Sequence, residues 1–376
     1  MSKVALFYLD KYEIENVYNA LKKGIDLVGG IEKFVNKDEK ILIKPNLLKP
    51  RSPEYAVTTH PSVFEAMVKI LKENDYKNIS YGDSPGKGST ISVAKESGLY
   101  DIGEKYNIEL KDFSQGNTVH NPENDFAKQF EIANAVTESD SIISISKMKT
   151  HQLTRITGAI KNIFGCVNGF NKGASHVKFS DGESFSKMLI DLVKTIKPKL
   201  NIMDGVVAME GNGPGSGTPT KMNVLLISED PIAIDIIFAK MVNLDRNYLP
   251  FIEYSRKINY GTKEEDIEIV GDDLDKFINK EFDVVREPVG IGKFDKYKRF
   301  RRFLLKKPYV IQKRCIKCKI CVNACPLSDK AISFNEKENR ISYDYSKCIR
   351  CYCCQEMCQS KAIEVKTPIL NKILIR

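Results

Sequence analysis

CIKCKICVNACP at residues 315–326 and CIRCYCCQEMCQ at residues 348–359 decide the organisation of this chain. Each stretch spaces four cysteines as Cys-x2-Cys-x2-Cys-x3-Cys, and together they hold eight of the ten cysteines among 376 residues. Three thiolates at such short intervals can wrap one 4Fe–4S cubane, and the offset fourth thiolate reaches a neighbouring cubane. The repeat therefore predicts a bacterial-type ferredoxin module with two 4Fe–4S clusters.

Because the fourth thiolate of each motif is expected to bind the other cluster, the ligands fall into two sets. Cys353 stands next to a ligand but breaks the spacing, so we expect a packed or free thiol that the clusters do not need. Gln359 also departs from the pattern, because the first copy has Pro326 there. The predicted sets are Cys315, Cys318, Cys321 and Cys358 for one cluster, and Cys348, Cys351, Cys354 and Cys325 for the other.

Other uses of these cysteines fit the sequence less well. Disulfides would need a secreted chain, and residues 1–25 show no basic segment followed by an apolar one. A third cysteine at the same interval does not suit tetrahedral zinc. The segments AISF and RISYD between the motifs predict a β-hairpin. Cysteines that bind these clusters must stay reduced. We therefore expect a cytoplasmic protein with a role in low-oxygen metabolism.

Composition restricts the partners of the chain. No run of 18 apolar residues is present, which predicts that nothing spans a membrane. The formal charge is +9, but two clusters with their thiolates would contribute about −2 each. The remaining charge does not call for nucleic acid. The sequence leaves the oligomeric state open.

The residues before the module alternate strand and helix patterns, which predicts an α/β fold whose mainly parallel sheet has helices on both faces. We expect an α/β domain at residues 1–280, a linker at 281–307 and the ferredoxin module at 308–376. The predicted strands cover residues 3–9, 40–44, 79–82, 141–146, 200–203 and 222–228, and the predicted helices cover residues 14–28, 61–74, 184–196 and 231–242.

The linker contains KFDKYKRFRRFLLKK at residues 293–307, with an aromatic residue every three positions from Phe294 to Phe303. The favoured interpretation is a connecting helix whose aromatic side packs and whose basic side is solvated. A surface that binds a membrane or an acidic partner is the alternative. A third use is to offset the charge of the clusters or to attract an acidic electron donor.

Unusual polar residues follow the predicted strands, where ligands bind in such sheets. Lys147, Lys149 and His151 alternate after one strand, so a continued extended chain would point all three to one side. Crowded cations need an anion, which predicts a pocket for carboxylate or phosphate. The proposed catalytic residues are Lys149 and His151, with His176 in a Gly- and Ser-containing loop. The expected binding residues are Lys44, Asn46, Asp83, Lys147, Lys161, Asn162, Asp204, Glu210 and Asn212.

A family resemblance becomes visible at these residues. KPNLL, GDSPG, SKMKTH with TGAIKN, DGVVAMEGNGP and DPIAID occur in order, and the chain resembles the family called domain of unknown function 362. It is similar to the subset with a C-terminal two-cluster module. The resemblance implies a redox-active iron–sulfur protein of a kind common in anaerobes, and it gives no substrate. The resemblance also implies that the expected binding residues, together with Lys149 and His151, are recurrent polar positions of the family.

These observations favour an iron–sulfur oxidoreductase. Electrons from a ferredoxin-like redox partner would pass through two clusters to a small anionic substrate. The alternative is a non-enzymatic electron carrier, or a scaffold for maturing another metalloprotein. A third hypothesis uses Asp83, Asp204, Glu210 and Asp235 as a divalent metal site.

Overall fold

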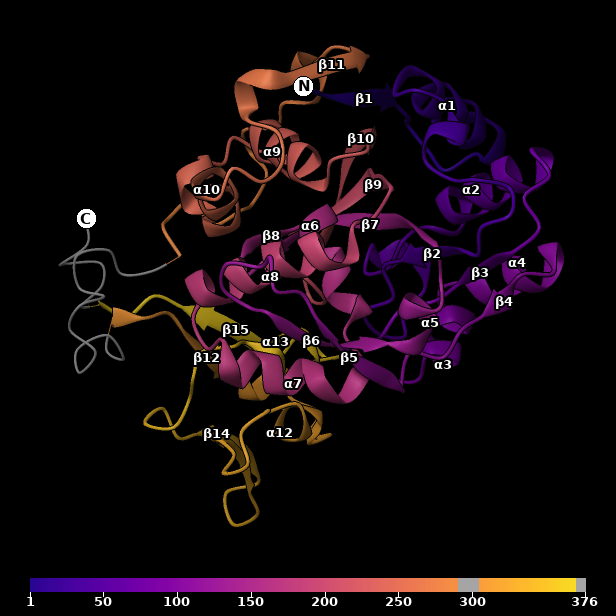
Figure 1. Cartoon of the computed structure of the whole chain (residues 1–376). Coiled ribbons are helices and arrows are strands. Elements are labelled where there is room, and N and C mark those ends of the chain that lie inside the picture. The colour runs from indigo at the N-terminus through magenta and orange to yellow at the C-terminus, as the bar shows by residue number, and fades with distance from the viewer. Residues whose placement is uncertain (290–303, 370–376) are drawn as a thin grey trace.

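The computed structural model describes residues 1–289 and 304–369. Within these residues one large sheet crosses the first domain (Figure 1), and β8 (Arg155–Thr157) pairs with the end of β7. The strand order is β11 (Ile267–Gly271), β1 (Ser2–Tyr8), β10 (Thr218–Ser228), β9 (Leu200–Glu210), β7 (Ser141–His151), β2 (Ile41–Pro45), β3 (Ile79–Tyr81) and β4 (Glu109–Leu110).

The sheet is mainly parallel, as the sequence predicts. β2 runs parallel to β3 and β7, and β7 runs parallel to β9. β10 is antiparallel to both β9 and β1. The register pairs Ile43 with Tyr81 and with Ile143, so β2, β3 and the first half of β7 are aligned across the sheet. The residues that follow β2 and β3 therefore meet at the same edge, beside the extended end of β7.

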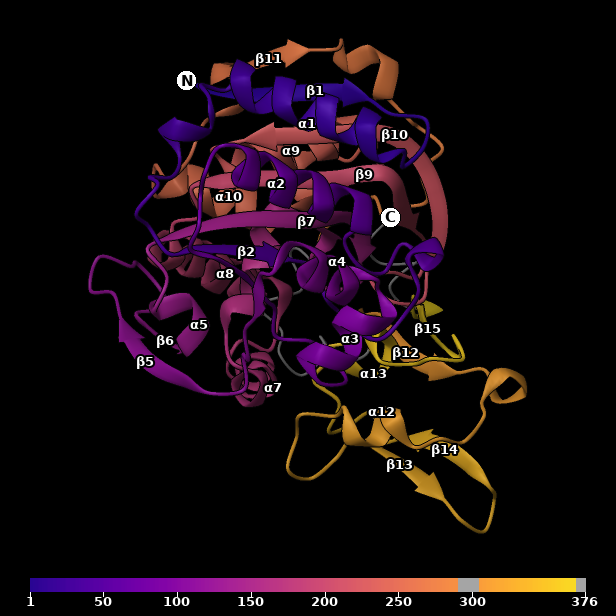
Figure 2. The same cartoon turned by 90° about the vertical axis from the view of Figure 1, so that its right-hand side faces the viewer.

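Helices cover both faces of the sheet (Figure 2), which confirms the α/β class. In β2, Ile41 and Ile43 pack into one buried cluster and Leu42 into the other, because successive side chains point to opposite faces. One face is covered by α1 (Ile14–Leu27), α2 (Pro61–Glu73), α3 (Thr90–Glu96) and α4 (Leu99–Tyr106), and the other by α6 (Ala159–Asn162), α8 (Gly182–Ile196), α9 (Pro231–Met241) and α10 (Pro250–Lys257).

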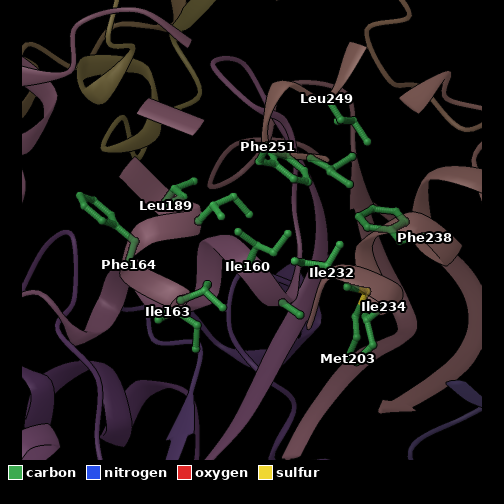
Figure 3. Packing of buried hydrophobic residues seen from close by; sticks show 14 of the residues in the cluster. Ile160, Ile163, Phe164, Leu189, Met203, Ile232, Ile234, Phe238, Leu249 and Phe251 are labelled. Carbon is green, nitrogen blue, oxygen red and sulfur yellow. The ribbon is translucent and has the colours of Figure 1, made fainter. Parts of the chain in front are cut away.

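The second face carries the larger apolar core (Figure 3). Phe238 of α9 and Phe251 of α10 pack with Ile160 of α6 in one cluster. Asp230 caps α9 by accepting hydrogen bonds from the amides of Ile232 and Ala233. This core fixes α6, the short helix that carries Lys161 and Asn162.

Some elements differ from the sequence prediction. β7 continues to His151 and β9 to Glu210, well beyond their apolar segments, because neighbouring strands supply backbone partners for the polar residues. The hairpin of β5 (Gly116–His120) and β6 (Gln129–Ala133) and the short α5 (Asn134–Thr137) were not predicted. The loop expected around His176 is wrong: this residue lies in α7 (Gly169–Lys178), which Asn168 caps.

The C-terminal module is small, and its part with α12 (Ile320–Asn323) and β14 (Arg340–Tyr343) lies below α3 and α7 in Figures 1 and 2. The predicted hairpin is confirmed by the antiparallel pairing of β13 and β14. Of the linker, residues 290–303 and their aromatic repeat lie outside the described residues. The module contains β12 (Lys307–Val310), α12 (Ile320–Asn323), β13 (Ile332–Asn335), β14 (Arg340–Tyr343), α13 (Cys353–Glu356) and β15 (Ile363–Lys366). Among the described helices, none is long and apolar enough to cross a membrane.

Candidate functional site

A cavity of about 380 Å³ lies between the strand ends of the α/β domain and the ferredoxin module. The α/β domain contributes its polar wall, and the module contributes Cys325, Cys353 and Glu356. Four of the lining residues are lysines and two are carboxylates, Asp83 and Glu356, so the wall is basic on balance. The lysines are Lys44, Lys149, Lys161 and Lys172.

Lys44 and Asp83 form the base of this cavity. The Lys44 ammonium lies 2.9 Å from Asp83 Oδ1 and donates to Asn162 Oδ1 at 3.1 Å. Asp83 Oδ2 accepts a hydrogen bond from the amide of Leu47. A Cβ on Gly165 would lie 1.9 Å from Asp83 Oδ1, so the backbone can approach this pair only at a glycine. The ion pair is therefore held in place from several sides.

Lys149 is buried beside this pair. Its ammonium donates to Asn46 Oδ1 at 2.6 Å and to the carbonyl of Val57 at 2.7 Å. Burial and then the nearby charges of Lys161 and Lys147 hold the pKa of Lys149 well below its usual value. A lysine with a depressed pKa gives up its proton more readily, so this side chain can supply a proton to a bound group.

Two further lysines complete the basic wall. Lys172 of α7 donates to the carbonyls of Ser84 and Pro85, and burial lowers its pKa to about 8. Lys161 lies above the ring of Phe164 and forms no ion pair with a described residue. Its charge is thus available to an anion in the cavity.

His176 also faces the cavity, from α7. Its ring stacks on Phe185, with centroids 4.6 Å apart, and meets the edge of Phe164. Burial lowers the pKa of His176 to about 3, so the imidazole is neutral at physiological pH. Its buried Nδ1 has no hydrogen-bond partner among the described residues. A ligand in the cavity would supply the missing partner.

His151 lies behind the cavity wall and does not line it. Its Nδ1 accepts the amides of Leu153 and Thr154, which places the proton on Nε2. That nitrogen lies 2.9 Å from Glu356 Oε1 of the module. Burial lowers the pKa of His151 to about 4. Burial opposes ionisation of Glu356, but His151 and Lys161 outweigh it and lower the pKa of this carboxyl. His151 thus positions Glu356, which forms the wall.

Other residues expected in the pocket serve elsewhere. Lys147 lies 2.8 Å from Asp204 Oδ2, and the same carboxylate accepts from the hydroxyl of Tyr12, whose ring stacks on His60. Glu210 accepts the amide of Asp283. These side chains are fully engaged in the interior or at the surface of the α/β domain, so the structure does not bring them to the cavity.

The carboxylates suggested for a divalent metal are also dispersed. Asp83 pairs with Lys44 and Asp204 with Lys147, whereas Asp235 accepts the amides of Ala159 and Ile160 at the start of α6. Among the described residues, no three His, Cys, Asp or Glu side chains converge as a single-ion site.

The module cysteines are grouped by the fold. A small cavity is lined by one predicted ligand set, which joins three thiols of the first motif to one of the second, and these four thiols match the donors of a 4Fe–4S cluster. In the other set, burial and then the nearby Cys351 and Cys348 raise the pKa of the Cys354 thiol, while Cys325 borders the basic cavity. The first set is Cys315, Cys318, Cys321 and Cys358.

Polar contacts fix the second motif to the α/β domain. Lys49 is buried and donates to the carbonyls of Glu356 and Cys358. Gln355 donates to the carbonyl and side chain of Asn212, whose own amide donates to the carbonyl of Ile363. Asn212 therefore holds the module in place and does not reach the cavity.

Sequence reasoning missed Lys172 and Glu356. Lys172 does not follow a predicted strand. Glu356 lies between two predicted cluster ligands, where a carboxylate is expected to be exposed to solvent. A signal for Glu356 exists only after folding, in the buried His151 that faces it.

Comparisons with known proteins agree with this architecture. A family model for a 4Fe–4S dicluster domain matches residues 307–359. A thylakoid-associated protein of Synechocystis sp. is 31% identical over 251 residues, which cover 66% of this chain and 77% of that protein.

Two solved structures are also similar. The lactate racemase apoprotein of Thermoanaerobacterium thermosaccharolyticum has a TM-score of 0.42 at 13% identity, with 61% of this chain and 54% of that chain covered. A structural-genomics protein of Thermotoga maritima has a TM-score of 0.37 at 12% identity, with 59% and 57% covered. The chain thus spans little more than half the length of either. The model called domain of unknown function (DUF362) matches residues 41–240, and the chain belongs to this family.

Proposed function

We propose that this protein is an iron–sulfur oxidoreductase that passes electrons through two 4Fe–4S clusters to a small anionic substrate in the basic cavity. One observation carries the proposal: Cys325, a predicted cluster ligand, lines the same cavity as four lysines. A substrate bound by those lysines would lie against the cysteine that holds the cluster. The clusters, when bound, supply single electrons.

Named residues take distinct parts in this proposal. Lys161, which forms no ion pair with a described residue, binds the carboxylate or phosphate of the substrate, and Lys172 adds a second charge. Lys149 delivers a proton, because burial makes its ammonium more acidic. His176 offers its unpartnered Nδ1 to a polar group of the substrate. The cavity wall of the module excludes water from the side of the clusters.

The test compares two lysines that each lie over a phenylalanine ring. Lys161 lies 5.7 Å from the centroid of the Phe164 ring, and Lys178 lies 5.4 Å from that of Phe179, but only Lys161 lines the cavity. The anaerobic holoprotein, Lys161→Ala and Lys178→Ala are screened by thermal shift against small carboxylates and inorganic phosphate. We expect at least one anion to stabilise the wild type and Lys178→Ala, and to bind Lys161→Ala about ten- to a hundredfold more weakly.

The same variants separate enzyme from carrier. Iron content and reduction by dithionite are expected to be equal in all three proteins, because both substitutions leave every predicted cluster ligand in place. If no anion stabilises any of them and electron transfer is unchanged, the protein is an electron carrier or a maturation scaffold.

We also propose that the protein works in a reducing compartment, the cytoplasm, where thiolates stay available to iron. The Synechocystis relative is called thylakoid-associated. Fractionation of cells followed by immunodetection tests this, and recovery in the membrane fraction would contradict it.

A further inference from the structure

Cys318 is unlike the other predicted ligands, because its side chain is exposed while the remaining seven, all in the described part of the chain, are buried or half-buried. It stands in a surface loop between η8 (Gln312–Arg314) and α12. Ile316 beside it is 65% exposed, an uncommon position for a large apolar side chain. A cluster held by Cys318 would therefore come close to the surface, beside an exposed apolar side chain.

Basic residues surround this spot. Lys313 and Lys317 are exposed and form no ion pair with a described residue, whereas Arg314 pairs with Glu364 and Lys319 with Glu336. Lys87, from the GDSPGKG loop of the α/β domain, lies near Cys318; burial lowers the pKa of Lys87, and the nearby thiolate partly opposes this. We define the Cys318 face as Ile316 and Cys318 together with the surrounding basic residues Lys87, Lys313, Arg314, Lys317 and Lys319.

The Cys318 face and the cavity lie at different cluster sites. Cys318 shares its small cavity with Cys315, Cys321 and Cys358. The basic cavity is bordered by Cys325, which belongs to the other predicted set. With both clusters bound, the Cys318 face and the basic cavity would therefore be served by different clusters.

We propose that the Cys318 face is the docking surface for a small acidic electron-transfer protein. The partner loses one electron and the cluster gains it, with no bond made or broken. An apolar centre inside a charged rim is the anatomy of a protein interface, and the positive rim selects a negative partner. This inference rests on electron transfer through the clusters, but it does not depend on the substrate in the cavity.

The experiment measures the bimolecular rate at which reduced flavodoxin, an acidic flavoprotein, reduces the anaerobic holoprotein. The variant is Lys313→Glu with Lys317→Glu. The control is Lys77→Glu with Lys257→Glu, because both lysines are exposed, lie outside the module and form no ion pair with a described residue. Both variants change the net charge equally. Reduced methyl viologen, a small cation, serves as a second donor.

We expect the Lys313 and Lys317 variant to be reduced by flavodoxin about tenfold more slowly, or worse, at low ionic strength, while the control keeps most of its rate. The difference should shrink as salt shortens the Debye length. Unchanged reduction by methyl viologen shows that the clusters are intact. If charge reversal costs iron, Lys313→Gln with Lys317→Asn replaces it, because Asn tolerates the positive φ of 58° at position 317.

Equal rates for the variant and the wild type overturn the proposal. An equal slowing of variant and control overturns it as well, since only total charge would then matter. No substrate is present in this assay, so its failure leaves the function proposed for the cavity untouched.

Discussion

We expect Lys172 to make anion binding in the cavity depend on pH. Its pKa of about 8 means that the ammonium is charged below pH 8 and loses its proton as the pH rises through that value. Binding of an anion favours the charged form and so raises this pKa. We therefore expect the affinity for an anion to fall as the pH rises above about 8, by up to about tenfold per pH unit. Titration calorimetry across this range measures the effect.

The control for this pH dependence is Lys172→Met, which removes the charge. Its affinity should be lower at neutral pH and should not change around pH 8. A wild-type affinity that stays constant up to the usual lysine range would show that Lys172 does not contact the ligand.

Cys353 and Cys354 are neighbours with different expected roles. Cys353 lines the cavity, whereas Cys354 is a predicted ligand that the hydroxyl of Tyr343 contacts at 3.2 Å. We expect Cys353→Ser to keep full iron content and Cys354→Ser to lose or degrade a cluster. Iron and sulfide analysis under anaerobic conditions measures both. The opposite result would mean that the ligand register is shifted by one residue.

The sequence predicted the residue types of the cavity better than their positions. Six residues expected in the pocket line the cavity: Lys44, Asn46, Asp83, Lys149, Lys161 and Asn162. The first four lie in or just after predicted strands, whereas Lys161 and Asn162 end α6, a helix that was not predicted. Lys147 was grouped with Lys149 by alternation alone. The ladder shifts register between these two residues, and Lys147 meets Asp204 instead. Such a shift has no signal in a single sequence.

At the scale of elements, β7 shows where prediction by hydropathy ends. Its apolar half was predicted, but the strand runs on to His151 because β8 and β9 hydrogen-bond its polar half. The helices with a strong apolar stripe, such as α1 and α8, were predicted nearly to the residue. α7, with the sequence GFNKGASHVK, has few apolar residues and two glycines, Gly169 and Gly173, so it was predicted to be a loop.

The α/β domain should fold without the module, because its two apolar cores come from its own elements except for Tyr352 and Val365. Residues 1–290 expressed alone are therefore expected to give a folded circular dichroism spectrum. Loss of the buried Tyr352 should lower the free energy of unfolding by about 2–3 kcal/mol relative to the full chain. Chemical denaturation of both proteins compares them. An unfolded fragment would place the domain boundary elsewhere.

At the scale of the whole molecule, the doubled cysteine motif predicts about eight irons and eight acid-labile sulfides per chain. A broad charge-transfer absorption should bleach with dithionite. Anaerobic metal and sulfide analysis checks the number, with a variant lacking Cys318 as the control, because it removes a ligand from the surface set only. Stoichiometric zinc without iron would contradict the assignment.

The contacts between the two domains bear on whether the ferredoxin module can be exchanged for that of another protein. In these contacts Gln355 donates to Asn212, and Lys49 donates to the carbonyls of Glu356 and Cys358. A ferredoxin domain grafted from another protein would bring its own cysteines and hold iron. It would not bring Glu356 or Gln355, nor fit the close approach at Gly215, where an added Cβ would lie 2.7 Å from the Glu356 carbonyl. Such a chimera would conduct electrons beside an open cleft. The two domains have therefore to be inherited, or engineered, as a matched pair.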